Sequence, residues 1–138
     1  MRHTRMLLAA VLVVLIAAPA SAESYMVGTW FGYGQPENKN AMYIDRMMAD
    51  GTWRGEYRTC FKGKPDDQVQ TGRWSLQGDI LTLQVATVNG KPSPRTDAYK
   101  MLAHSAKTQK YLSLNWNFPY TPERVVDDFR MPPCDLTS

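Results

Sequence analysis

The sequence has 138 residues, with 16 Lys or Arg, 13 Asp or Glu and two cysteines. Arg2 and Arg5 lie in a leader that we expect to be removed, which leaves 14 basic residues against 13 acidic ones. A chain this close to neutrality, with no basic block, lacks the electrostatic footprint of a nucleic-acid-binding protein.

The first 22 residues predict a secretory signal peptide. The basic start MRHTR is followed by an apolar run over residues 6–18 and by the small-residue ending PASA, a pattern typical of cleaved leaders. A membrane anchor would need about 20 apolar residues, and Pro19 and Glu23 interrupt the run. We therefore expect cleavage after Ala22, no membrane anchor, and one exported domain over residues 23–138, either periplasmic or secreted.

Alternation of apolar and polar residues between turn residues recurs along the rest of the chain, and this period of two predicts strands. The eight predicted strands cover residues 27–33, 41–48, 52–61, 69–76, 80–88, 96–103, 110–116 and 124–131. Asp50-Gly51 predicts a tight hairpin between the second and third strands, because glycine accepts a positive φ without steric cost. Successive strands with short links predict an antiparallel up-and-down barrel, which removes exposed sheet edges. A two-sheet sandwich is the alternative.

Cys60 and Cys134 are the two cysteines, and both lie in the exported part. An even count in an oxidising compartment favours a disulfide, and two unpaired thiols are the alternative. The bridge would tie the C-terminal tail to the third predicted strand. The chain-entropy model gives it a stabilisation of about 4 to 5 kcal/mol.

Gly28-Thr29-Trp30 lies on the first predicted strand and Arg130 on the last one. This GxW pattern resembles the lipocalin and avidin families, together called calycins, and in particular the short bacterial exported lipocalin-like type. TGRW and GDILTL, within residues 71–83, are similar to a central hairpin of that type. The resemblance implies a lipocalin-like barrel closed at one end by Gly28, Trp30 and Arg130, the arginine stacking on the tryptophan. It also implies a bridge from Cys60 to Cys134.

Alternation divides the third predicted strand into two faces. One face carries Trp53, Gly55, Tyr57, Thr59 and Phe61, and the other carries Arg54, Glu56, Arg58 and Cys60. If the aromatic face is inside, the charges form a solvated surface. If the charged face is inside, Arg54 and Arg58 would bind a ligand carboxylate and Glu56 would neutralise the cavity.

The aromatic and methionine content suits an adaptable apolar pocket and equally an ordinary core. The candidate ligand-binding residues are Arg54, Glu56, Tyr57, Arg58, Tyr99, Tyr111 and Trp116. The resemblance and the alternating strands together predict a non-enzymatic barrel that binds a small, partly apolar molecule inside. We expect no cofactor and no metal, because His104 is the one histidine of the exported part.

Two alternatives remain open. A protein-binding module, for example an inhibitor of an extracellular hydrolase, would use the loops at residues 34–40, 63–67 or 117–122. A packed interior with an exposed aromatic at a loop tip would favour it. An enzyme would use a carboxylate as base and a tyrosine as acid. The candidate bases are Glu56, Asp97 and Asp127, and the candidate acids are Tyr57 and Tyr99. A buried carboxylate with a strongly raised pKa facing a cavity would favour the enzyme.

Overall fold

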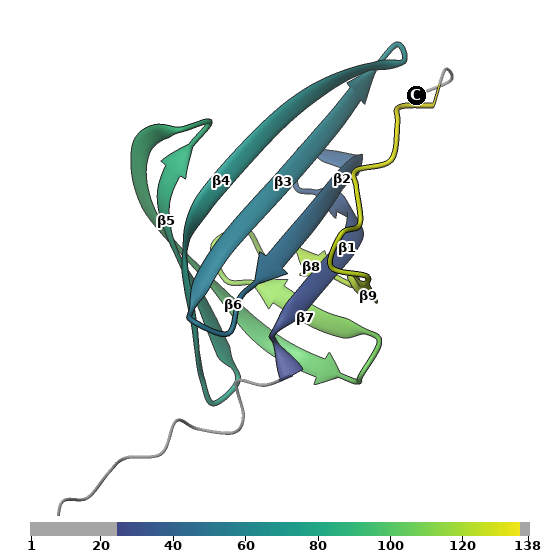
Figure 1. Ribbon diagram of the computed structural model, residues 1–138. Helices are drawn as coiled ribbons and strands as arrows, with labels where there is room; N and C mark the ends of the chain where they lie inside the picture. Colours follow the sequence, from purple (N-terminus) through teal and green to yellow (C-terminus); the bar gives the residue numbers. More distant parts are fainter. Residues whose placement is uncertain (1–24, 136–138) are drawn as a thin grey trace, which may run out of the picture.

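The computed structural model describes residues 25–135, so the predicted signal peptide at residues 1–22 lies outside the described residues. These residues form one curled antiparallel sheet of nine strands (Figure 1). The strands are β1 (Gly28–Gln35), β2 (Asn38–Met47), β3 (Thr52–Phe61), β4 (Lys64–Gln77), β5 (Ile80–Val88), β6 (Lys91–His104), β7 (Gln109–Ser113), β8 (Pro119–Tyr120) and β9 (Glu123–Val125). Strands β1 to β7 each pair with the next strand in the chain, and β9 pairs with β1. Across residues 25–135, no helix has the length and apolar character to cross a membrane.

The all-β prediction is confirmed, and the predicted strands at residues 52–61 and 80–88 coincide with β3 and β5. The Asp50-Gly51 turn is also confirmed: the Asp50 carboxylate accepts hydrogen bonds from both the backbone amide and the hydroxyl of Thr52. The prediction of eight strands is wrong at the C-terminal end: the sheet has a ninth strand, because β8 forms in the predicted link between the last two strands, and β9 stops at Val125 instead of continuing to residue 131. The chain makes a turn there, with the amide of Phe129 donating to the carbonyl of Val126 at 3.0 Å.

Strand β9 links the end of the sheet to its beginning. On one side Arg124 pairs with Trp30 of β1. On the other side the Arg124 amide donates to the carbonyl of Lys107 at 2.7 Å, and the Gln109 amide donates to the carbonyl of Pro122 at 3.1 Å. The curled sheet therefore has a barrel-like shape, with its last strands hydrogen-bonded to its first.

The arginine that stacks on Trp30 is Arg124, and the prediction of Arg130 is wrong. The Arg124 guanidinium lies 4.3 Å from the centroid of the Trp30 ring. Arg130 is exposed and lies beyond the turn that ends the sheet, so the register places Arg124 opposite Trp30 instead. Gly28, the third residue predicted at this end, does lie here, because a side chain at that position would collide with the Arg124 guanidinium.

The Arg124 side chain also fixes the segments around it. Its guanidinium donates to the backbone carbonyls of Tyr25, Val27 and Ala106. The Trp30 indole N–H donates to the carbonyl of Met26 at 3.0 Å. The N-terminal segment and the loop before β7 are thereby attached to the same pair of side chains, and they close this end of the barrel.

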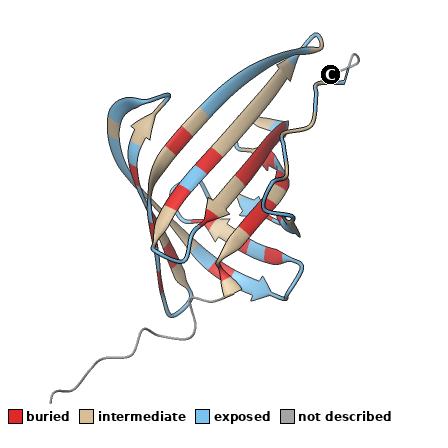
Figure 2. Cartoon of the chain, in the orientation of Figure 1, coloured by how far each residue is buried: buried red, intermediate tan, exposed pale blue. Residues whose placement is uncertain are grey.

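The core fills the closed end and leaves the other end open. Buried and exposed positions alternate along the strands, and neither residues 58–61 of β3 nor residues 64–68 of β4 include a buried position (Figure 2). The core side chains are Met26, Trp30, Tyr43, Met47, Trp53, Trp74, Leu76, Leu81, Leu83, Val85, Met101, Tyr111 and Tyr120. The hairpin of β3 and β4 therefore projects beyond the core, at the open end.

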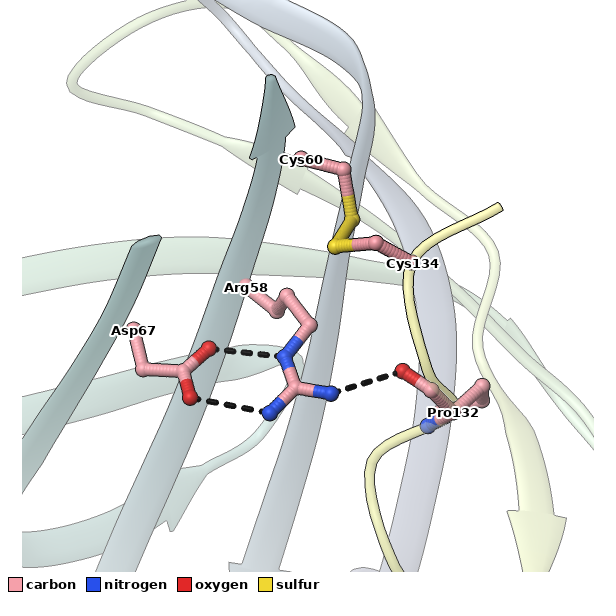
Figure 3. Close-up of a disulfide and its surroundings, with 5 residues drawn as sticks. All are labelled: Arg58, Cys60, Asp67, Pro132 and Cys134. Atoms are coloured by element: carbon pink, nitrogen blue, oxygen red, sulfur yellow. Dashed lines mark hydrogen bonds and ion pairs between the residues drawn. A yellow bond between two sulfur atoms is a disulfide. The ribbon is translucent and has the colours of Figure 1, made fainter. Parts of the chain in front are cut away.

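The predicted disulfide is confirmed. Cys60 of β3 is bonded to Cys134 of the tail, with the two Cα atoms 5.6 Å apart (Figure 3). Beside the bridge, the Arg58 guanidinium donates to the carbonyl of Pro132 and makes two hydrogen bonds to the Asp67 carboxylate. The bridge and Arg58 together hold the tail against the outer face of the sheet.

A second arginine holds the tail closer to the turn. Arg46 of β2 donates to the backbone carbonyls of Asp127 and Phe129, and the Phe129 ring lies 5.0 Å from the ring of Phe31 on β1. The tail therefore covers the outer face of β1, β2 and β3, which accounts for the complete burial of Ile44 on that side of β2.

Replacing Arg124 with alanine is expected to lower the free energy of unfolding by about 1 to 2 kcal/mol, because the cation–π contact and the hydrogen bonds to three carbonyls are lost. Urea unfolding measures the effect. Arg130→Ala is the matched control and should change stability by no more than about 0.5 kcal/mol, as for an exposed residue. Equal losses in the two variants would contradict the assignment of Arg124.

Replacing Cys60 and Cys134 together with serine is expected to lower the free energy of unfolding by about 2 to 5 kcal/mol. The bridge joins residues 74 positions apart, so its loss gives the unfolded chain much more freedom. Urea unfolding with and without a reductant measures the effect. The reductant should destabilise the natural protein and leave the double variant unchanged; equal stability of the oxidised natural protein and the double variant would contradict the expectation.

Candidate functional site

The charged face of β3 lies outside the barrel. Glu56 pairs with Arg46 at 2.9 Å on the face that the tail covers, Arg58 binds Asp67 and the tail, and Arg54 is exposed. The hypothesis that Arg54 and Arg58 bind a ligand carboxylate inside the barrel, with Glu56 beside them, is therefore wrong. The physical reason is that the tail supplies a carbonyl acceptor for Arg58 on the outside, while Arg54 is exposed to solvent.

The inner face of the first three strands carries a carboxylate that the sequence analysis did not single out. The register pairs Asp45 of β2 with Trp30 of β1 and with Gly55 of β3. A Cβ on Gly55 would lie 2.6 Å from a Trp53 ring atom and 2.8 Å from the Tyr57 hydroxyl oxygen. Glycine thus leaves room for both side chains to turn toward Asp45.

Two hydrogen bonds orient the Asp45 carboxylate. The Trp53 indole N–H donates to Oδ1 at 3.0 Å, and the Tyr111 hydroxyl donates to Oδ2 at 3.5 Å. Burial raises the pKa of Asp45 to about 6, and the two hydrogen bonds offset part of that rise. Near neutral pH the carboxylate is therefore charged, and among residues 25–135 no lysine or arginine forms an ion pair with it.

Five tyrosines surround this carboxylate. They are Tyr43, Tyr57, Tyr99, Tyr111 and Tyr120. Their rings pack against one another, with centroids 5.6 Å apart for Tyr43 and Tyr120 and 5.4 Å apart for Tyr99 and Tyr111. Burial first, and then the negative charge of Asp45, raises the pKa of Tyr120 to about 12. Burial raises the pKa values of the other four as well, so all five hydroxyls stay neutral.

Asp45 and the five tyrosines line a cavity of about 30 Å³, which we call the inner cavity. This volume holds one or two groups of the size of a water molecule. Asp45 is deep in the protein, yet part of its surface is accessible because it borders this space. The inner cavity is thus small, aromatic and negatively charged.

The interior widens toward the open end into a hollow of about 730 Å³, which we call the mouth. The residues that border both the inner cavity and the mouth are Gln35, Tyr57, Tyr99 and Tyr120. The charged residues that line the mouth are Glu37, Asp66, Asp67, Asp97 and Arg95. Arg95 pairs with Asp97 at 3.0 Å, and Asp67 pairs with Arg58. The mouth therefore has an acidic lining.

The structure brings together three of the predicted ligand-binding residues. Tyr57, Tyr99 and Tyr111 line the inner cavity, and Trp116 lies apart from them at the rim of the mouth, where it is 67% exposed. The sequence contained a signal for Asp45, because it alternates with Tyr43 and Met47 on one face of β2. That signal was hidden, since Met42 and Ile44 on the opposite face are buried as well.

The predicted protein-binding loop at residues 117–122 does not expose its aromatic side chains. Residues 34–40 form the hairpin of β1 and β2, with only Pro36 and Glu37 between the strands. In the segment at residues 117–122, Tyr120 is buried and the Phe118 ring packs 5.0 Å from it. These two aromatics belong to the barrel wall.

The chain matches no protein-family model and no curated protein sequence. A charged carboxylate among neutral tyrosine hydroxyls can accept hydrogen bonds from a cation or accept a proton, and the surrounding rings exclude bulk water.

Replacing Asp45 with asparagine is expected to change how stability depends on pH. The pKa of Asp45 is raised in the folded state, so between about pH 4 and pH 6 the unfolded chain releases this proton first and ionisation disfavours folding. The natural protein should therefore lose stability relative to Asp45→Asn between about pH 4 and pH 7, by on the order of 2 to 3 kcal/mol.

Urea unfolding of both proteins at the two pH values measures this difference. Asp128→Asn is the control, because it removes an exposed carboxylate of the tail. A stability difference between the natural protein and Asp45→Asn that stays constant with pH would show that Asp45 does not ionise as described.

Proposed function

We propose that this chain is an exported, non-catalytic binding protein that takes a small, partly apolar molecule into its barrel. The observation that carries the proposal is the mouth of about 730 Å³, which narrows onto the tyrosine-lined inner cavity. Ligand sites in proteins commonly measure about 300 to 1,000 Å³, with mostly apolar walls and a few polar groups. The mouth supplies the volume, and the inner cavity supplies the polar groups that would orient the ligand.

The resemblance to lipocalin-like and avidin-like barrels supports the same proposal. Those families hold small ligands inside a barrel, and here a GxW tryptophan, Trp30, lies under a stacked arginine at the closed end. The disulfide supports export, since such bonds persist in oxidising compartments and are rare in the cytosol. The predicted leader would deliver the chain to the periplasm or the medium.

One observation favours an enzyme instead. Asp45 is an enclosed carboxylate with a raised pKa, next to tyrosine hydroxyls and facing a cavity, which is the arrangement expected of a general base. A different observation favours a protein partner: Trp116 and Phe61, at the open end, are 67% and 70% exposed. The ligand screen described next distinguishes both alternatives from the proposed binding function.

The test is a panel of fatty acids, phenols, tetrapyrroles and amines, screened by thermal unfolding. At least one class should raise the melting temperature by several degrees, because a ligand that binds only the folded state stabilises it. Thr59→Trp, which places a large ring in the mouth, should abolish that shift. Arg54→Trp, which places the same ring on the outer face of the same strand, should preserve it.

A ligand recovered unchanged after long incubation supports binding without catalysis, whereas a converted ligand supports the enzyme. A panel in which no compound shifts the melting temperature, or equal loss of the shift in Thr59→Trp and Arg54→Trp, contradicts the proposal. If no compound shifts the melting temperature, the exposed side chains of Trp116 and Phe61 at the open end favour a protein partner instead.

A further inference from the structure

We propose that the ligand is a primary amine whose ammonium group lies in the inner cavity beside Asp45, with its hydrocarbon body extending into the mouth. This inference rests on the proposed function and names the class of ligand. It is carried by four features of the interior: an unpaired charge, an unpartnered tyrosine hydroxyl, the size of the inner cavity and the charge of the mouth.

The first feature is the negative charge of Asp45. An enclosed carboxylate is expensive unless it is paired or hydrogen-bonded. In the part of the chain that the structure describes, its partners are two neutral donors, Trp53 and Tyr111. These orient the carboxylate without neutralising it. A cation in the adjacent cavity would supply the missing charge.

The second feature is a tyrosine hydroxyl that has no hydrogen-bond partner among the described residues. The Tyr43 hydroxyl is buried and makes no hydrogen bond to any described residue, although Tyr111 lies close to it. Tyr57 and Tyr99 line the same cavity. A primary ammonium has three N–H donors and no acceptor. It can therefore donate to the Asp45 carboxylate and to two tyrosine oxygens, while the ring faces contribute cation–π attraction.

The third feature is size. The inner cavity of about 30 Å³ admits one or two water-sized groups, which suits an –NH₃⁺ group and excludes a trimethylammonium group. The residues shared by the two spaces, among them Tyr57, Tyr99 and Tyr120, form a ring through which a chain would pass. Aromatic side chains in this ring suit the methylene groups next to the nitrogen.

The fourth feature is the charge of the mouth. Asp67 and Asp97 are paired with arginines, whereas Glu37 and Asp66 form no ion pair with any residue from 25 to 135. A concave surface with excess negative charge attracts cations and repels anions. Fatty acids and other carboxylates are thus disfavoured relative to amines of the same length.

The test is titration calorimetry with three probes of equal length, hexylamine, hexanol and hexanoate, near neutral pH. Hexylamine should bind about ten to a hundred times more tightly than hexanol, because hydrogen bonds to a charged group contribute about 1.5 to 3 kcal/mol each. Hexanoate should bind more weakly than hexanol. N,N,N-trimethylhexylammonium should also bind weakly, because its head group is too large for the inner cavity.

Two variants locate the ammonium group. Asp45→Asn should weaken hexylamine binding by about tenfold to a hundredfold and should weaken hexanol binding by a much smaller factor, because hexanol carries no charge to pair with Asp45. Tyr43→Phe, which removes only the unpartnered hydroxyl, should weaken hexylamine binding by a smaller factor. The matched control is Asp128→Asn, which removes one carboxylate far from the interior and should leave hexylamine binding unchanged.

The possible failures are distinguishable. Hexanol or hexanoate binding as tightly as hexylamine, or full hexylamine affinity in Asp45→Asn, overturns the amine assignment and leaves a small-molecule binding protein. No binding by any of these probes, together with a negative wider panel, overturns the proposed function as well. If Asp45→Asn does not fold, the comparison of hexylamine with hexanol on the natural protein decides the question.

Discussion

The pairing of β1, β2 and β3 in one continuous register puts Trp30, Asp45 and Gly55 side by side on the inner face of the sheet. Three features of the interior depend on this alignment. Trp30 supports the closed end, Asp45 brings a charge inside, and Gly55 leaves the space into which Trp53 and Tyr57 turn. A shift of the register by one residue would turn all three outward and would direct the charged face of β3 into the core, at a prohibitive desolvation cost.

Two arginines on the outer face of the sheet have partners that neutralise them, whereas Asp45 on the inner face has no such partner among the described residues. Outside, Arg46 and Arg58 are satisfied by nearby carboxylates and by carbonyls of the tail, which the disulfide keeps in place. Inside, Asp45 is satisfied only in part, by an indole and a hydroxyl. A protein selected for stability alone would have little reason to retain a lone charge there, because a buried ion without a counterion weakens the folded state. The unmatched charge of Asp45 is therefore the observation on which the proposed amine ligand rests.

Particular elements show how far sequence patterns reach. Strand β3 alternates cleanly between aromatic and charged residues, and its bounds were predicted correctly because one face meets the core and the other meets water and the tail. Strand β2 is buried on both faces, so its alternation could not show that Asp45 lies inside. The last predicted strand failed at Val126, where the chain leaves the sheet and the arginine opposite Trp30 becomes Arg124. A pattern of alternating apolar and polar residues does not show at which residue a strand stops pairing with its neighbour in the sheet.

The sequence by itself determined the class of structure: antiparallel strands joined by tight turns, a glycine-tryptophan pair at the closed end, and two cysteines able to form a bridge. These features depend on local conformational preferences and on residue composition, and both can be read from short stretches of the sequence. Only the tertiary structure decided which face of β3 lies inside, which arginine covers Trp30, and that Asp45 meets five tyrosines in one cavity. Those outcomes depend on the register between strands and on the path of the tail, and both are set by contacts between residues far apart in the sequence.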